Sequence, residues 1–128
     1  MPKHVIQTDK GAPPLGAYSQ GWRAGDFIFV TGTGPIGTDG KVVGDTIEEQ
    51  TEKAIDNIEA ILQADGASLG DVVKVSVHLI DTNLFPRYNA VYKERFSEPF
   101  PGRTTVGSDL HQVPGMMIEI DCIAYVGE

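Results

Sequence analysis

Alternating hydrophobic and polar positions predict several strands along the chain. Residues 27–31 are aromatic or β-branched, and residues 17–22 form a second, shorter candidate. Residues 38–40, Thr-Asp-Gly, predict a turn. In the segment 72–80, apolar residues at the odd positions alternate with Lys, Ser and His at even positions, which is typical of a half-buried strand.

Two segments predict amphipathic helices. Over residues 47–62, apolar side chains recur three or four positions apart and form one stripe. Thr46 and Glu49 fit a capping box at the start of this helix, and Gly66 is placed to end it. A second apolar face runs over residues 84–96, with a proline in the first turn, where a missing amide costs little.

Two further strands are predicted near the C-terminal end, at residues 103–107 and 116–126. In the second of these, the even-numbered residues from 118 to 124 are apolar and are expected to face the core. The opposite face mixes charged and apolar side chains: Met117, Glu119, Asp121, Ile123 and Tyr125.

The order of strands, helix, strand, helix and strands predicts an α+β fold. We expect a mixed β-sheet with two helices packed on one face. No further element remains to cover the semi-apolar second face, so a homo-oligomer is expected, with an exposed amphipathic face on a monomer as the alternative.

Composition narrows the class of protein. The 128 residues, of which 41% are hydrophobic, indicate one globular domain spanning residues 1–128. The net charge of −8 and the scattered basic residues argue against nucleic acid as a partner. No signal peptide and no apolar run of the roughly 18 residues needed to span a membrane are found, so a soluble cytoplasmic protein is expected.

Metal and thiol chemistry find little support in the sequence. The single cysteine, Cys122, excludes an internal disulfide and a cysteine metal cluster, and its position predicts a buried apolar role. The histidines, His4, His78 and His111, lack metal-ligand spacing, and no metal is expected. His78 is expected to be solvated or hydrogen-bonded. For His111, the rim of a pocket is an alternative to a plain surface position.

The segment from Gly32 to Gly37 matches G-x-G-x-x-G as a string. A dinucleotide-binding motif needs a helix that opens within it, so that helix amides face the pyrophosphate. Pro35 interrupts the segment and a turn follows, so this interpretation is rejected. Gly32 remains of interest because a glycine allows close approach of a ligand to the backbone.

Arg103 and Glu119 are the two charged residues that suggest a site. Arg103 begins a strand among small residues, and a guanidinium binds a carboxylate with two parallel hydrogen bonds. Glu119 lies between two isoleucines in the most apolar strand. If a second subunit covers this face, the pKa of Glu119 should rise, which makes it a candidate acid or base. Surface positions for both residues are the alternative.

These residues, in this order, resemble the RidA/YjgF family of reactive-intermediate deaminases. The resemblance covers nearly the whole chain. It rests on residues 15–21 (Leu-Gly-Ala-Tyr-Ser-Gln-Gly), 30–32 (Val-Thr-Gly), 88–92 (Tyr-Asn-Ala-Val-Tyr), 102–106 (Gly-Arg-Thr-Thr-Val) and 118–120 (Ile-Glu-Ile).

The resemblance implies a chorismate-mutase-like protomer, assembled as a homotrimer around an inner β-barrel with clefts between subunits. It implies hydrolysis of enamine or imine intermediates, such as 2-aminoacrylate, to a 2-oxo acid and ammonia, without a cofactor. In this scheme Arg103 binds the substrate carboxylate and Glu119 positions or activates water. The substrate-binding residues that the resemblance and the mechanism suggest are Arg103, Tyr18, Thr31, Gly32, Asn89 and Thr105.

Several departures from the family pattern leave the substrate open. Thr105 stands where many members carry cysteine, Ala17 replaces a usual proline, and Thr33 and Gly34 replace a bulkier pair. The spacing from Arg103 to Glu119 resembles the 2-aminomuconate deaminases of the same superfamily. Alternatives are a 2-aminomuconate-type deaminase, a non-catalytic protein that binds 2-oxo acids, a protein-holding chaperone and, disfavoured by charge, an RNA-cleaving translation inhibitor.

Overall fold

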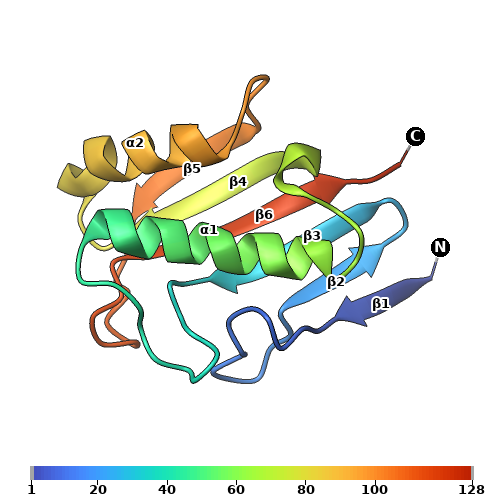
Figure 1. Cartoon of the computed structure of the whole chain (residues 1–128), viewed down its shortest axis with the longest axis horizontal. Coiled ribbons are helices and arrows are strands. Elements are labelled where there is room, and N and C mark those ends of the chain that lie inside the picture. The colour runs from blue at the N-terminus through green and yellow to red at the C-terminus, as the bar shows by residue number, and fades with distance from the viewer. Residues whose placement is uncertain (1, 128) are drawn as a thin grey trace.

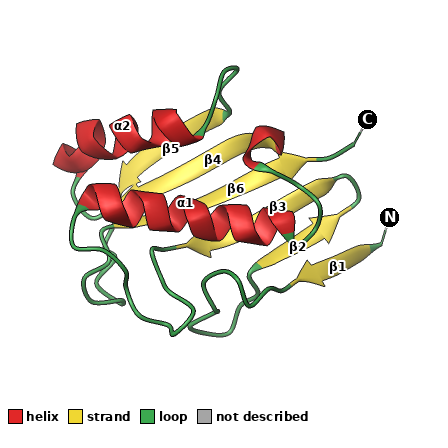
Figure 2. Ribbon diagram, viewed as in Figure 1, coloured by secondary structure: helices red, strands yellow, loops and turns green. Residues whose placement is uncertain are grey.

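The computed structural model describes residues 2–127, which form one β-sheet with two α-helices on one of its faces (Figure 1, Figure 2). The strands are β1 (Lys3–Ile6), β2 (Gly21–Ala24), β3 (Phe27–Thr33), β4 (Val72–Leu79), β5 (Gly102–Gly107) and β6 (Ile118–Tyr125). The helices are α1 (Ile47–Gln63) and α2 (Phe85–Arg95), with short 3₁₀ turns at Leu69–Asp71 and Thr82–Leu84.

The strand order in the sheet is β1-β2-β3-β6-β4-β5. All neighbouring strands are antiparallel except β4 and β5, which are parallel and joined through α2. The last strand in sequence, β6, therefore lies in the middle of the sheet between β3 and β4. The predicted α+β class, with a mixed sheet and both helices on one face, is confirmed.

The predicted start and end of α1 are both present. Oγ1 of Thr46 accepts a hydrogen bond from the Glu49 amide at 3.1 Å, and Oε1 of Glu49 accepts one from the Thr46 amide at 3.1 Å. Gly66 has a φ of +81°. The next amide, that of Ala67, donates to the carbonyl of Leu62 at 2.9 Å, which closes the helix end.

The core lies between the helices and one face of the sheet. The even-numbered residues of β6 point into it, as predicted, and Ile118, Ile120 and Ala124 are fully buried. From α2, Tyr88 and Tyr92 complete this core. These contacts hold the two helices over the central strands. The loops that connect the helices to the strands are therefore anchored at both ends.

Two details of the predicted strands are wrong. In β4, Val73 is 49% exposed because the pairing with β6 shifts between Val72 and Lys74, which turns the side chain out of the core. The strand predicted over residues 17–22 starts only at Gly21. The side chain of Gln20, just before it, binds the carbonyls of an adjacent loop instead.

The second face of the sheet is covered by no element within residues 2–127. Large side chains are exposed along it, among them Trp22, Phe27, Phe29 and Tyr125. Their positions follow from the register, since Phe29 pairs with both Trp22 and Ile123. The expected homo-oligomer would bury this face and stays a prediction. None of the described helices has the length and apolar character needed to cross a membrane.

Candidate functional site

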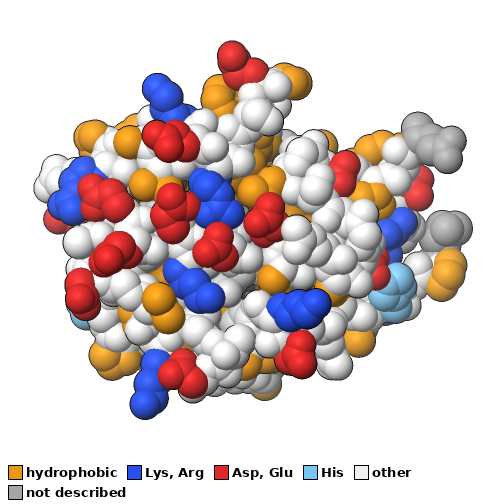
Figure 3. Space-filling view, in the orientation of Figure 1, with side chains coloured by type: hydrophobic (Ala, Val, Ile, Leu, Met, Phe, Trp, Pro, Cys, Tyr) orange, Lys and Arg blue, Asp and Glu red, His pale blue; other side chains and the backbone are white. Residues whose placement is uncertain are grey.

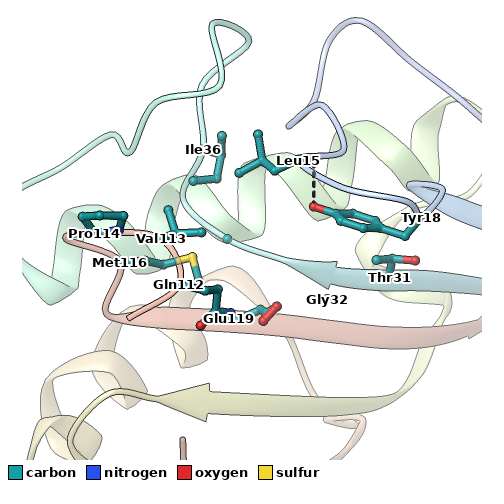
Figure 4. A pocket seen from close by; sticks show the side chains of 11 residues that line it. Leu15, Tyr18, Thr31, Gly32, Ile36, Gln112, Val113, Pro114, Met116 and Glu119 are labelled. Atoms are coloured by element: carbon teal, nitrogen blue, oxygen red, sulfur yellow. Dashed lines mark hydrogen bonds between the residues drawn. The ribbon is translucent and has the colours of Figure 1, made fainter. Parts of the chain in front are cut away.

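Four of the residues singled out in the sequence line one cavity of about 550 Å³ beside the C-terminal end of β3 (Figure 4). They are Tyr18, Thr31, Gly32 and Glu119. The cavity is within the roughly 300–1,000 Å³ typical of small-molecule sites. The remaining lining residues are Leu15, Gly34, Ile36, Gln112, Val113, Pro114 and Met116.

An irregularity in β3 brings Gly32 against Glu119. The pairing of β3 with β6 shifts between Val30 and Thr33, so Thr31 and Gly32 lie in a β-bulge. A Cβ atom on Gly32 would lie 2.8 Å from Oε1 of Glu119. Bulges often occur beside active sites because they free backbone groups from the strand ladder. Here the bulge places bare backbone next to a carboxylate.

Two buried amide side chains of α1 hold the loops around the cavity. Nδ2 of Asn57 donates to the carbonyls of Gly34 and Ile36, at 2.9 and 2.8 Å. Oε1 of Gln50 accepts from the Met117 amide at 2.7 Å. The sequence analysis missed both residues. The feature that could have revealed them is a polar residue at a position of the apolar helix stripe. Gln50, for example, lies one turn after Ile47.

Tyr18 enters the cavity from the N-terminal loop. The residue is 47% exposed, and its hydroxyl oxygen accepts a hydrogen bond from the backbone amide of Leu15 at 2.9 Å (Figure 4). Because the amide uses the oxygen as an acceptor, the hydroxyl proton remains able to donate. Tyr18 therefore presents a hydrogen-bond donor at the mouth of the cavity that Glu119 lines.

Arg103 occupies a second, separate pocket together with Asn89. Its guanidinium lies 4.5 Å from the centre of the Tyr92 ring and 5.4 Å from each of the Phe85 and Tyr88 rings. Nη1 of Arg103 donates to Oδ1 of Asn89 at 2.8 Å. The group is thus held in one orientation by stacking and a single hydrogen bond.

Charge pairing distinguishes Arg103 from the other arginines. Arg23, Arg87 and Arg95 each form an ion pair with a carboxylate. In the described part of the chain, no carboxylate lies within ion-pair distance of Arg103. A half-buried guanidinium in a pocket, with most of its N–H donors free, is well suited to bind an anion.

Tyrosine side chains surround Arg103 as neutral groups. Burial raises the pKa of Tyr92 to about 12, although the positive charge of Arg103 opposes the shift. Burial also raises the pKa of Tyr88, whose hydroxyl lies 2.6 Å from Oγ1 of Thr105. Thr105 therefore contacts α2 through Tyr88. The hydroxyl that the proposed mechanism places in contact with substrate is hydrogen-bonded within the protomer.

Arg103 and Glu119 lie on opposite faces of the sheet. Arg103 pairs with Val75, which in turn pairs with Cys122, so these three side chains point toward the helices. Glu119 pairs with His78, and both face the uncovered side. One protomer therefore brings Glu119 together with Tyr18, Thr31 and Gly32, and Arg103 together with Asn89, but does not join the two groups.

The other titratable groups singled out in the sequence line neither the cavity beside Glu119 nor the pocket of Arg103. Nδ1 of His78 lies 2.6 Å from Oγ of Ser108. His111 contacts Asp109 on an exposed loop and also lines a further pocket, in line with the alternative given for it from the sequence. Cys122 is buried, which raises the pKa of its thiol to about 12 and keeps it unreactive. Within residues 2–127, no three His, Cys, Asp or Glu side chains gather in a way that could hold a metal ion.

Comparison with known proteins gives consistent matches over the whole chain. The family model described as "Endoribonuclease L-PSP" matches residues 9–126. A RutC family protein from Pyrococcus abyssi is 47% identical, covering 98% of each chain. The 2-iminobutanoate/2-iminopropanoate deaminase of Dermatophagoides farinae is 35% identical, also covering 98% of each chain. RidA from an Antarctic Psychrobacter has a TM-score of 0.90 at 34% identity, covering 96% of this chain and 99% of that one.

Proposed function

The chain belongs to the endoribonuclease L-PSP family, which includes RidA, and on this premise we propose that it is an enamine/imine deaminase. The substrate is a 2-imino acid or its 2-enamino tautomer, and the products are a 2-oxo acid and ammonia. The observation that carries the proposal is the unpaired guanidinium of Arg103, which Asn89 and three aromatic rings hold ready for a carboxylate.

Arg103 binds and polarises the substrate. A bidentate pair between its guanidinium and the carboxylate fixes the position of the neighbouring imine carbon. The positive charge also draws electron density from that carbon, which favours attack by water. The hydroxyl groups of Tyr88 and Tyr92 stay protonated near neutral pH, because burial raises their pKa. They therefore add no negative charge that would compete with the substrate carboxylate for Arg103.

Glu119 moves the protons of the reaction. An enamine first takes a proton at carbon and becomes the imine. Water then adds to the imine carbon, and the resulting carbinolamine loses ammonia to leave the 2-oxo acid. Glu119 holds the water, accepts its proton and returns a proton to the leaving nitrogen. General acid–base catalysis of this kind contributes about 10²–10⁴-fold to the rate.

The complete site requires two copies of the chain. Since Arg103 and Glu119 lie on opposite faces of one sheet, Arg103 of one protomer would have to meet Glu119 of its neighbour. We propose the homotrimer that the family resemblance implies, with one cleft at each of its three interfaces. The exposed aromatic side chains on the sheet face supply the apolar surface for such contacts.

Turnover of 2-aminoacrylate tests the proposal. The enamine is generated in place by an amino-acid dehydratase, and the surviving imine is trapped with semicarbazide and followed by absorbance. The native protein should remove the imine faster than the Arg103→Ala variant, with the assembly unchanged in both. Equal rates for the two proteins would exclude the carboxylate-binding role of Arg103. A Glu119→Gln variant should lower the rate and leave binding of a 2-oxo acid nearly intact.

Mixing the two impaired variants tests the shared site. If Arg103 and Glu119 act across an interface, trimers refolded from equal amounts of Arg103→Ala and Glu119→Gln chains contain intact clefts, about one quarter of the total. Activity should therefore return to roughly that fraction of the native value. If both residues acted within one chain, every cleft in the mixture would lack one of them, and no activity would return.

RNA cleavage is the alternative that the description of the family model suggests. The surface over the helices opposes it, because acidic groups outnumber basic ones on this face and several belong to α1 (Figure 3). Arg95, one of the basic groups there, is already paired with Glu52 and Asp56. RNA phosphates would be repelled by this face and by the net charge of −8.

A further inference from the structure

The pocket of Arg103 contains a second positive charge. It has a volume of about 390 Å³ and is lined by Asn89, Tyr92, Lys93, Phe100, Pro101 and Arg103. Within residues 2–127, its lining thus includes two cations and no aspartate or glutamate. In a chain with 18 acidic and 10 basic residues, a pocket of this composition indicates a negatively charged ligand. The carboxylate next to the imine carbon accounts for Arg103 and leaves Lys93 without a role.

Lys93, like Arg103, forms no ion pair. In the described part of the chain, no carboxylate lies within ion-pair distance of its ammonium group. Arg95 lies two positions further along α2 and shows the contrast, because it binds Glu52 and Asp56. Lys93 is exposed, and its flexible four-carbon stem allows the ammonium group to move toward a ligand. Its charge is therefore available to a molecule in the pocket.

The helix period places Lys93 beside the residue that holds Arg103. Lys93 follows Asn89 by four positions in α2, so their Cβ atoms are neighbours on one face, about 5–6 Å apart. Asn89 in turn accepts the hydrogen bond from Nη1 of Arg103 at 2.8 Å. The two carboxyl carbons of an extended five-carbon dicarboxylate are roughly 5 Å apart. Such a molecule can therefore reach both cations at once.

The rest of the pocket lining presents carbon surface. Phe100 is 48% exposed, and Pro101 follows it directly before β5. The centre of the Tyr92 ring lies 4.5 Å from the guanidinium of Arg103. Methylene groups that join two carboxylates gain from contact with these surfaces, because they leave water. A small inorganic dianion such as phosphate has no carbon chain and would not use them, so the lining favours a dicarboxylate.

We propose that Lys93 determines substrate specificity, and that the substrate is a 2-imino acid with a second carboxylate, such as the imine derived from glutamate. This inference rests on the proposed deaminase function and narrows its substrate class. Arg103 binds the carboxylate next to the imine carbon, and Lys93 binds the carboxylate at the other end of the chain. A monocarboxylic imino acid of the same length leaves Lys93 without a partner and binds more weakly.

Binding of the product acids tests the second carboxylate without any turnover. Calorimetry compares 2-oxoglutarate with 2-oxopentanoate, which has the same number of carbon atoms and lacks the second carboxylate. An ion pair with an exposed lysine is worth up to about fivefold in affinity, so we expect 2-oxoglutarate to bind about fivefold more tightly. The preference should shrink as KCl is added, because salt screens the pair. Equal affinities, or tighter binding of 2-oxopentanoate, would overturn the proposal.

Substitutions of Lys93 connect the preference to this residue. Lys93→Gln removes the charge and keeps most of the side-chain length, so the ratio of the two affinities should fall to near one. Lys93→Glu should reverse the preference, and Lys93→Arg should retain most of it. Lys41→Gln is the matched control, because it changes the net charge equally at an exposed position outside the pocket. If Lys93→Gln and Lys41→Gln had the same effect on the ratio, the role of Lys93 would be rejected.

Turnover of matched imines tests the preference in the reaction. Amino-acid oxidases convert glutamate and norvaline to their imines, catalase removes the peroxide, and semicarbazide traps what survives. In the native protein, kcat/KM for the glutamate-derived imine should exceed that for the norvaline-derived imine about fivefold. Lys93→Gln should abolish this difference. A preference for the norvaline-derived imine, or an equal loss for both imines in Lys93→Gln, would contradict the inference.

The binding and turnover experiments separate this inference from the proposed function. If 2-oxoglutarate is preferred through Lys93 and no imine is hydrolysed, the dicarboxylate site stands and the deaminase function fails. If both imines are hydrolysed equally well by the native protein and by Lys93→Gln, the deaminase function stands and the role of Lys93 is rejected.

Discussion

Gly32 and Glu119 face each other across neighbouring strands so closely that the glycine cannot be replaced without moving the carboxylate. A Cβ on Gly32 would lie 2.8 Å from Oε1 and 3.1 Å from the carboxyl carbon. Such a contact forces the side chain of Glu119 to shift. The carboxylate of Glu119, the proposed proton-transfer group, can therefore keep its position only because residue 32 in the β-bulge has no side chain.

Gly32→Ala should therefore reduce activity while the fold is retained. The new methyl group displaces the Glu119 carboxylate from the water it is proposed to hold. We expect kcat for 2-aminoacrylate to fall by about 10²-fold or more, within the range lost with a general base. Far-ultraviolet circular dichroism should remain native. Unchanged kcat would mean that the carboxylate is not placed by this contact.

Substitutions of Asn89 should change the affinity for carboxylates through Arg103. Asn89→Ala removes the hydrogen bond that orients the guanidinium, so KM should rise by roughly tenfold, as is usual for hydrogen bonds to charged groups. Asn89→Asp should weaken binding further, because the new carboxylate pairs with Arg103 and competes with the substrate. The measurement is calorimetric binding of a 2-oxo acid to each variant.

A neutral ligand provides the control for this prediction. The amide of the same 2-oxo acid lacks the carboxylate, so its weak binding should change little between Asn89→Ala and Asn89→Asp. If both variants lost acid and amide binding equally, Asn89 would contribute to the general shape of the pocket and not to the orientation of Arg103.

The fold could be predicted from the sequence to a large extent because its signals are local. The apolar stripe of α1, its capping box and the alternation in β6 each depend on spacing within one element. The exposed Val73 and the late start of β2 escaped prediction because they depend on strand pairing. A bulge shifts the side-chain alternation without any change in composition.

The candidate site was predictable only as a set of residues. Chemistry and resemblance singled out Arg103 and Glu119, but which face each occupies follows from the pairing of β4 with β5 and β6, a long-range feature. Gln50 and Asn57 were missed because each is a polar residue on an apolar helix face. Their roles depend on loops distant in sequence, with Gln50 binding the amide of Met117, 67 positions away.

Loss of the helix cap should destabilise the protein without affecting chemistry. Thr46→Ala removes the acceptor for the Glu49 amide, which typically costs about 1 kcal/mol of unfolding free energy. We expect the midpoint of thermal unfolding to fall by a few degrees for a domain of this size. Thr46→Ser keeps the hydroxyl and should retain most of the stability. An equal loss in both variants would point to the methyl group of Thr46 instead.

Alkaline pH should destabilise the folded protein through Cys122. Burial raises the pKa of this thiol from 9.0 to about 12, so the folded protein keeps its proton while the unfolded chain loses it. The stabilising effect of the neutral thiol is fully present below pH 9 and is lost as the pH rises toward 12. Its slope approaches about 1.4 kcal/mol per pH unit.

Urea unfolding from pH 7 to 10.5 measures this loss, with the protein concentration held constant because oligomers unfold in a concentration-dependent way. Cys122→Ala should flatten the decline above pH 9. Part of the decline should remain, since burial also raises the pKa of Tyr92 from 10.0 to about 12. A Cys122→Ala profile that overlays the native one would show that the thiol ionises equally in the folded and unfolded protein, and is therefore accessible in the folded state.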